Sequence, residues 1–131
     1  MSDEKKFKIE YQMFRWGPLL VKTKIPESMR LKFLSEAKAS TENFEHKLAG
    51  VVNKEVGFRD KTMFLPFFNQ MFNLYADAQF KWSPEIGSTL ETFKQQYTLD
   101  SLWANFQRPG DFNPPHDHGG ALSWVIYLTM P

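Results

Sequence analysis

Two of the three histidines of this chain stand two residues apart, in the segment Asn113-Pro114-Pro115-His116-Asp117-His118-Gly119-Gly120. In an extended backbone, residues i and i+2 point to the same side, so His116 and His118 are expected to present both imidazoles to one point. Neutral imidazole binds iron, zinc, copper and nickel, and two such rings supply part of a coordination shell. The two glycines that follow allow a sharp turn and leave the site open to a ligand. The spacing therefore predicts a metal site at His116 and His118.

The same segment fits other interpretations. Its density of proline and glycine is typical of a solvated turn in which the histidines bind nothing. Short motif matches are also frequently accidental. Asp117 becomes a further ligand candidate if the backbone is not extended there. The third histidine, His46, is expected to be a surface residue on a helix and is assigned no role.

Three ordered stretches near the carboxyl end resemble the metal-site region of the iron(II)/2-oxoglutarate-dependent oxygenases. The similarity is closest to an uncharacterised branch of that superfamily in marine tailed phages, where a strand ending in Trp-x-Asn precedes Asn-Pro-Pro-His-x-His. The stretches are Leu102-Trp103-Ala104-Asn105-Phe106, Pro109-Gly110-Asp111-Phe112-Asn113-Pro114-Pro115-His116-Asp117-His118 and Leu122-Ser123-Trp124-Val125-Ile126-Tyr127-Leu128. They cover roughly the last 30 residues, and Leu48-Ala49-Gly50 is similar more faintly.

The resemblance implies roles for individual residues. His116 matches the first histidine of the family's His-x-Asp/Glu pair, and His118 stands where the family has the carboxylate. Tyr127 matches a position that in some relatives helps to hold the far carboxylate of 2-oxoglutarate, and Asn105 is expected to line the same cofactor pocket. As an alternative, both are ordinary strand residues with satisfied hydrogen bonds. The resemblance implies iron(II) and 2-oxoglutarate as cofactors, and no residue is assigned a catalytic role.

Two departures from the family pattern shape the expected function. A second neutral imidazole in place of a carboxylate leaves the metal more positive and shifts its redox balance. No histidine follows His118 and no arginine follows Arg108, whereas the family's distal histidine and its 2-oxoglutarate-binding arginine lie on later strands. We therefore expect the chain to be the N-terminal part of an oxygenase that hydroxylates a C–H bond, truncated at Pro131 and inactive by itself. The alternative is a naturally short protein that has lost the second half of the barrel.

Hydrophobic periodicity predicts the elements that position this segment. Alternation over residues 6–25, broken at Gly17-Pro18, predicts a hairpin. Pro26 and the spacing of Met29, Phe33 and Ala37 predict a first helix. Further helices are predicted from Ser40 or Thr41 to Gly50, over Thr62–Phe80 with Pro66 in its first turn, and from Glu85 or Ser88 to Tyr97 with a capping box at Ser88-x-x-Glu91. Alternation then predicts strands over Leu99–Gln107 and Ala121–Thr129.

Helices followed by strands indicate an α+β fold. We expect N-terminal helices packed on part of a double-stranded β-helix, or jelly-roll, whose barrel of about eight strands is incomplete. A single domain is predicted over residues 1–131, with a hairpin and helical support region over 1–98 and the first jelly-roll strands over 99–131. Exposed strand edges at Leu122–Leu128 are expected to pair in a homodimer.

Composition limits the classes of partner. The 131 residues carry 16 basic and 15 acidic side chains, so the net charge of +1 gives no electrostatic reason to expect nucleic acid or an anionic membrane. The absence of cysteine excludes a disulfide scaffold, a thiolate zinc site and a cysteine nucleophile. No apolar run approaches the roughly 18 residues that span a bilayer, and the start does not resemble a signal peptide.

These limits leave three classes of function. The first is the oxygenase, with a small-molecule co-substrate as partner and a cytoplasmic location, that of the host cell if the protein is phage-encoded. The second is a non-enzymatic, β-rich metal-binding or self-associating phage-type protein. The third is a viral structural or assembly protein, which would show no response to metal.

Overall fold

The computed structural model of the chain describes residues 7–15, 18–44, 51–82, 89–95 and 97–130. The chain divides into two compact units, each built from two segments. Unit 1 comprises Met1–Pro26 and Thr62–Leu99, and unit 2 comprises Glu27–Lys61 and Asp100–Pro131. The described residues form helices and two separate two-stranded antiparallel sheets, and neither sheet closes into a barrel. The predicted α+β class is confirmed.

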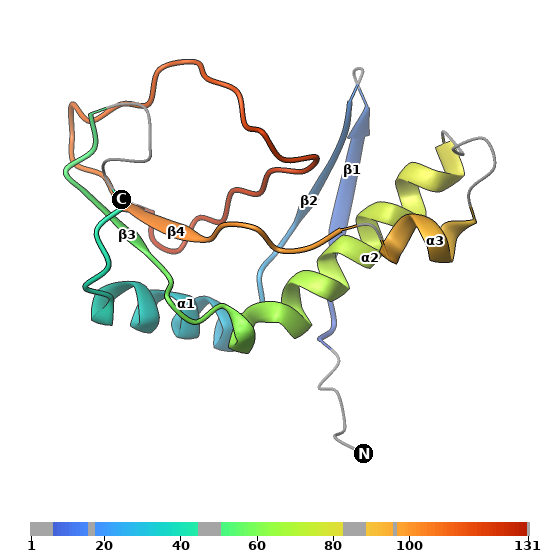
Figure 1. Ribbon diagram of the computed structural model, residues 1–131, viewed down its shortest axis with the longest axis horizontal. Helices are drawn as coiled ribbons and strands as arrows, with labels where there is room; N and C mark the ends of the chain where they lie inside the picture. Colours follow the sequence, from blue (N-terminus) through green and yellow to red (C-terminus); the bar gives the residue numbers. More distant parts are fainter. Residues whose placement is uncertain (1–6, 16–17, 45–50, 83–88, 96, 131) are drawn as a thin grey trace. The chain divides into compact units, whose positions relative to one another are not determined.

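Unit 1 begins with the predicted hairpin, formed by β1 (Tyr11–Arg15) and β2 (Leu19–Thr23). The strands lie side by side and pair antiparallel (Figure 1). Met13 lies opposite Val21, and Tyr11 lies opposite Thr23. Alternate residues of β2 are half-buried and exposed, as expected for a strand with one face toward a core. The hairpin prediction is confirmed.

The main helix of unit 1 is α2 (Leu65–Trp82), which follows a short 3₁₀ turn, η2 (Thr62–Phe64). Pro66 falls in the first turn, where its missing N–H breaks no intrahelical bond, as predicted. The helix buries one apolar stripe, and it also makes polar contacts to the first segment of the unit. The Tyr75 hydroxyl donates to the Leu19 carbonyl at 3.3 Å, and the Gln70 amide donates to the Phe7 carbonyl at 2.8 Å. The buried residues of the stripe are Phe67, Phe68, Met71, Ala76 and Ala78.

The last helix of unit 1, α3 (Leu90–Gln95), covers part of the predicted helix. Its start is capped by Thr89, whose hydroxyl accepts the Thr92 N–H at 3.2 Å, while the Thr92 hydroxyl accepts the Thr89 N–H at 2.9 Å. This reciprocal arrangement is a capping box one residue later than the predicted one. Ser88 itself lies outside the described residues. In Figure 1 α3 lies beside the end of α2, and Lys94 pairs there with Asp77 at 2.6 Å.

Unit 2 is built on α1 (Glu27–Ala39), β3 (Lys54–Gly57) and β4 (Trp103–Phe106). The helix buries Met29, Phe33 and Ala37, which is the predicted stripe. Phe33 meets Phe58 edge-on, with ring centroids 6.2 Å apart. The strands β3 and β4 pair antiparallel, so the predicted strand over Leu99–Gln107 is confirmed over Trp103–Phe106.

The predicted helix from Ser40 or Thr41 to Gly50 is wrong over the residues that the structure describes. The segment 40–44 is non-helical because its backbone pairs with the free edge of β3. The Phe44 N–H donates to the Glu55 carbonyl at 3.1 Å, and the Gly57 N–H donates to the Glu42 carbonyl at 2.9 Å. The rest of the predicted helix, residues 45–50, lies outside the described residues.

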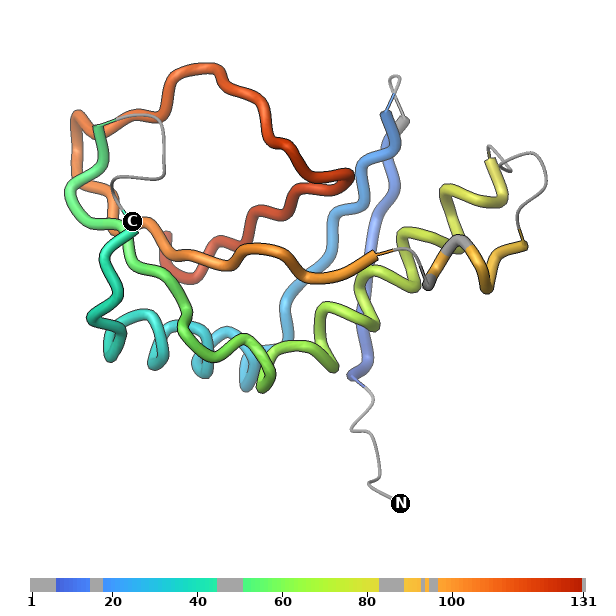
Figure 2. The backbone as a smooth tube through the Cα atoms, in the orientation of Figure 1, coloured from blue at the N-terminus to red at the C-terminus, as the bar shows by residue number. Residues whose placement is uncertain are grey.

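The predicted strand over Ala121–Thr129 is also not formed. Residues 107–130 carry no strand or helix, apart from an isolated bridge at Phe112, and Figure 2 shows them as an irregular path after β4. A strand needs a neighbouring strand to pair with its backbone N–H and C=O groups, and no described strand pairs with this segment. Arg30 of α1 contacts this segment, because its guanidinium donates to the Leu128 carbonyl at 2.6 Å.

Arg30 is itself held by Glu27, with a bidentate pair of hydrogen bonds at 2.6 and 2.8 Å. These bonds raise the pKa of the Arg30 guanidinium above its ordinary value, which keeps the group charged.

Among the described residues, no helix combines the length and the apolar character that crossing a bilayer requires.

Candidate metal site

The two histidines of the His-x-His segment lie side by side in unit 2. Their ring centroids are 4.8 Å apart, and the ring planes are inclined by 65°. Both side chains are exposed. The prediction that both imidazoles lie on the same side of the chain is confirmed by this geometry, whereas their binding of a metal stays a prediction.

One nitrogen of His116 is already engaged. Its Nδ1 lies 2.7 Å from the Pro114 carbonyl oxygen, and a carbonyl can only accept, so Nδ1 carries the proton. In this tautomer Nε2 carries the lone pair that a metal ion could bind. Metal-binding histidines commonly donate their second ring nitrogen to a backbone carbonyl in this way, which fixes the tautomer and the ring orientation.

His118 contacts an aromatic stack instead. Its ring lies 6.0 Å from the ring of Trp103, centroid to centroid, at an inclination of 31°. On β4, Trp103 stands opposite Gly57 of β3, and its ring stacks on Phe44 at 5.8 Å and 13°. The sequence shows Trp103 in the Trp-x-Asn motif, but the contact with His118 joins residues fifteen positions apart and has no local signal.

The carboxylate of Asp111 fixes the chain just before the histidines. Its Oδ2 accepts the Arg108 N–H at 2.9 Å and the Asn53 N–H at 2.7 Å, which ties the turn at Arg108–Asp111 to the segment before β3. Phe112 and Val51 then exchange two backbone hydrogen bonds, at 2.9 and 3.0 Å. A role for Asp111 was not predicted, although an aspartate closing a Pro-Gly turn is a recognised signal for such side-chain to backbone bonds.

The turn before Asp111 requires a glycine. Gly110 has a φ of 94°, a left-handed backbone conformation that residues other than glycine rarely adopt. The Asp111 N–H closes the turn on the Arg108 carbonyl at 3.0 Å. The loop that carries the histidines therefore starts from a turn that two hydrogen bonds close, one to the Asp111 side chain and one from the Asp111 N–H.

The other predicted site residues, Tyr127 and Asn105, are both exposed. The side chain of Tyr127 is 69% exposed, and no described strand pairs with its segment. Asn105 follows Trp103 on the same face of β4 and is exposed. Their contacts with 2-oxoglutarate stay predictions. His46, which was assigned no role, and the faint similarity at Leu48-Ala49-Gly50 lie outside the described residues.

Within the described part of the chain, no three histidine, aspartate or glutamate side chains are grouped so that they hold a metal ion. Asp117 is therefore not placed with the two imidazoles as a third ligand.

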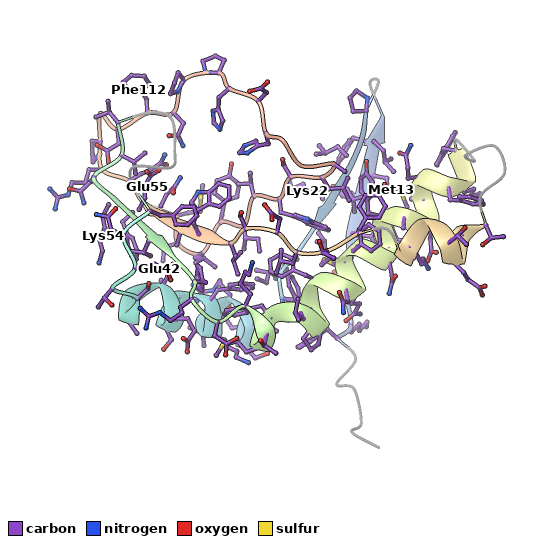
Figure 3. All side chains as sticks on the ribbon, in the orientation of Figure 1. Met13, Lys22, Glu42, Lys54, Glu55 and Phe112 are labelled. Atoms are coloured by element: carbon purple, nitrogen blue, oxygen red, sulfur yellow. The ribbon has the colours of Figure 1, made fainter. Side chains whose placement is uncertain are left out.

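A hollow in unit 2 at the end of α1 is lined by Glu36, Glu42 and Asp60 among others, and it does not include the histidines. Figure 3 shows Lys54 and Glu55 on β3, of which Lys54 is exposed and Glu55 is 5% exposed.

Comparison of the chain with protein-family models, with curated proteins and with solved structures finds no match.

Proposed function

We propose that this chain carries two metal ligands, His116 and His118, of an iron(II)/2-oxoglutarate-dependent oxygenase. The observation that carries the proposal is the pairing of the two imidazoles, with one of them locked to the Pro114 carbonyl. Loops with an accidental His-x-His sequence have no need of either feature. The resemblance of the surrounding motifs to the oxygenases supplies the class of reaction.

The spacing of the two rings fits a shared ion. Imidazole nitrogens lie about 2.1 Å from a bound first-row metal, which for two rings at roughly tetrahedral or octahedral angles puts the ring centres about 4.5–5.3 Å apart. The observed separation of 4.8 Å falls inside that range. His116 would bind through Nε2, because its Nδ1 donates to Pro114.

In this proposal the chain's own residues bind and orient, and the cofactor performs the chemistry. Iron(II) bound there would supply the oxidation of a C–H bond by dioxygen, with 2-oxoglutarate as co-substrate. The two histidines contribute no negative charge, so the remaining ligand positions favour anionic groups such as the carboxylate of 2-oxoglutarate. Asn105 and Tyr127 are the proposed contacts for that co-substrate.

The finer fold belongs to the same proposal. We infer that β4 belongs to a jelly-roll, in which the segment Ala121–Thr129 follows it. Leu122, Ile126 and Leu128 of that segment are half-buried, and the residues between them, Trp124 included, are exposed.

Metal titration followed at the histidine rings tests the site. Adding Co²⁺ or anaerobic Fe²⁺ is expected to shift and broaden the ring-proton resonances of His116 and His118 together, at the same metal concentration. His116→Ala and His118→Ala should each weaken binding by at least about tenfold. His46→Ala is the matched control and should bind like the wild type. Ring resonances that respond separately, or variants that bind normally, would refute the shared site.

A second titration tests the reaction class. 2-Oxoglutarate chelates a metal through its keto and carboxylate oxygens, whereas glutarate lacks the keto group. We expect 2-oxoglutarate, and not glutarate, to tighten metal binding by the wild type, because two histidines leave ligand positions open. Equal effects of the two acids would remove the support for an oxygenase and leave a metal-binding protein.

A second candidate function is self-association, and one observation favours it. The segment after Ser123 exposes several apolar side chains while no described strand pairs with it. The exposed fractions are 78% for Val125, 69% for Tyr127 and 71% for Met130. We propose a second copy of the chain as the partner, because a strand edge can pair antiparallel with its own copy around a two-fold axis.

Light scattering of two charge variants tests the self-association. Wild-type protein is expected to be dimeric at high concentration, and Val125→Lys should shift it to monomer because a charge blunts a strand edge. Leu31→Lys, which adds the same charge at a 51% exposed position on α1, is the control and should stay dimeric. A wild type that is monomeric at every concentration would exclude this function.

A further inference from the structure

The two histidines of the candidate site are held by different means. The His116 ring is fixed by its hydrogen bond to the Pro114 carbonyl at 2.7 Å. Among the described residues the His118 ring has no hydrogen bond, and its contacts are with aromatic rings, His116 at 4.8 Å and Trp103 at 6.0 Å. An exposed histidine without a tether samples several rotamers, so some other contact must select the one that lies beside His116.

Trp103 is well placed to act as that contact because its own ring is fixed. It lies on β4, which is paired with β3, and its ring is stacked on Phe44 at 5.8 Å. Phe44 is fixed in turn by its backbone bond to Glu55 at 3.1 Å and by its close approach to Gly57. A methyl group added at Gly57 would lie 2.9 Å from the Phe44 ring, so the ring lies directly against the strand.

We propose that Trp103 is a positioning residue, which holds the His118 imidazole beside His116 so that both rings reach one metal ion. The inference rests on the proposed function for the metal-binding step alone. The contact between Trp103 and His118 exists without metal and is testable without it. The face of an indole ring carries partial negative charge, and the contact of an imidazole with it is favourable and directional.

The first experiment is NMR of the metal-free protein. The ring current of Trp103 should displace the ring-proton resonances of His118 from their usual positions, and Trp103→Leu should return them to those positions. The resonance of the hydrogen-bonded Nδ1 proton of His116 should be the same in both proteins. A merely structural role of Trp103 would leave the His118 resonances at their usual positions in the folded wild type, and that result would overturn the proposal.

The second experiment measures Zn²⁺ affinity by calorimetry. Trp103→Leu is expected to lose about tenfold in affinity, the lower end of the effect seen when a residue that orients a metal ligand is removed. Trp103→Phe keeps an aromatic face and should recover most of the loss. Trp82→Leu, at a 59% exposed tryptophan of α2 in unit 1, is the matched control and should bind like the wild type.

The outcomes separate this inference from the proposed function. Normal Zn²⁺ binding by His116→Ala and His118→Ala would refute the shared site, while the His118 resonances of the metal-free protein still report on the Trp103 contact. Loss of binding in those two variants together with unchanged binding in Trp103→Leu would keep the site and overturn the role of Trp103. If Trp103→Leu does not fold, the comparison of Trp103→Phe with the wild-type resonances decides the matter.

Discussion

Single atoms determine how the histidine loop is held. One oxygen, Asp111 Oδ2, accepts two backbone N–H groups from segments more than fifty residues apart. One nitrogen, His116 Nδ1, is committed to the Pro114 carbonyl and leaves the other available. Hydrogen bonds that involve an ionised acceptor are shorter and stronger than neutral ones, so Asp111 is the stronger of the two anchors.

Replacement of Asp111 by alanine is expected to destabilise the fold by about 1–2 kcal/mol, because two N–H groups lose a charged acceptor and water replaces it only in part. Asp111→Asn keeps an acceptor oxygen without the charge and should lose less. Urea denaturation measures both changes. Asp117→Ala removes an exposed carboxylate six residues away and serves as the control, with an expected change of less than about 0.5 kcal/mol. Equal stability of Asp111→Ala and wild type would show that the turn holds without the carboxylate.

At the scale of elements, β3 is the strand on which unit 2 depends. It pairs with β4 along one edge and with residues 42–44 along the other, so it is the only described strand with partners on both sides. The Phe44 ring packs directly against the backbone of Gly57, the last residue of β3, because glycine has no side chain that would occupy that space. Through that ring the strand supports Trp103.

Gly57→Ala is expected to cost about 1–3 kcal/mol, because the added methyl group forces the Phe44 ring away from the strand. The near-ultraviolet circular dichroism of Trp103 should change at the same time, since its stacking partner has moved. Gly119→Ala is the matched control, because nothing lies within 4 Å of its added Cβ, and it should change the stability by less than about 0.5 kcal/mol. A destabilised Gly57→Ala with unchanged Trp103 dichroism would mean that the strain is relieved elsewhere.

The elements predicted correctly from the sequence are those whose pattern is local. The hairpin, the buried stripe of α1 and the long helix α2 each repeat an apolar period over many residues. The segment 40–44 was predicted helical because Phe44 and Leu48 share a helical spacing, yet its backbone pairs with β3. That pairing depends on residues more than ten positions away, which a local period does not contain.

In the candidate site, too, only the contacts between residues close in the sequence could be predicted. The approach of His116 to His118 follows from a two-residue spacing, so the sequence predicts it. The contacts of Trp103 with Phe44 and His118 arise from β-pairing between distant segments, and the sequence does not predict them. The proposed role of Tyr127 comes from the resemblance alone, because no described strand pairs with its segment and its side chain is 69% exposed.

At the scale of the whole molecule, the chain passes between its two units three times, after Pro26, Lys61 and Leu99. The predicted support region over residues 1–98 is consequently shared by both units. All contacts described for the histidines, for Trp103 and for Asp111 belong to unit 2. A ligand of the site therefore adds binding energy to unit 2, and the response of unit 1 reports whether the two units unfold together.

Hydrogen exchange with and without Zn²⁺ measures that response. A ligand at about ten times its dissociation constant stabilises the folded state by about 1.4 kcal/mol, which is a tenfold gain in protection. We expect this gain at the unit 2 amides of Gly57, Phe58 and Phe112, which bond across strands or bridges, and none at Lys24 of unit 1. Local opening of separate units produces this difference, because only states that break the site lose the ion. His118→Ala should abolish the gain. If the Lys24 amide gains as much protection from Zn²⁺ as the unit 2 amides do, the two units unfold as one. If no amide gains protection, bound zinc does not stabilise the fold.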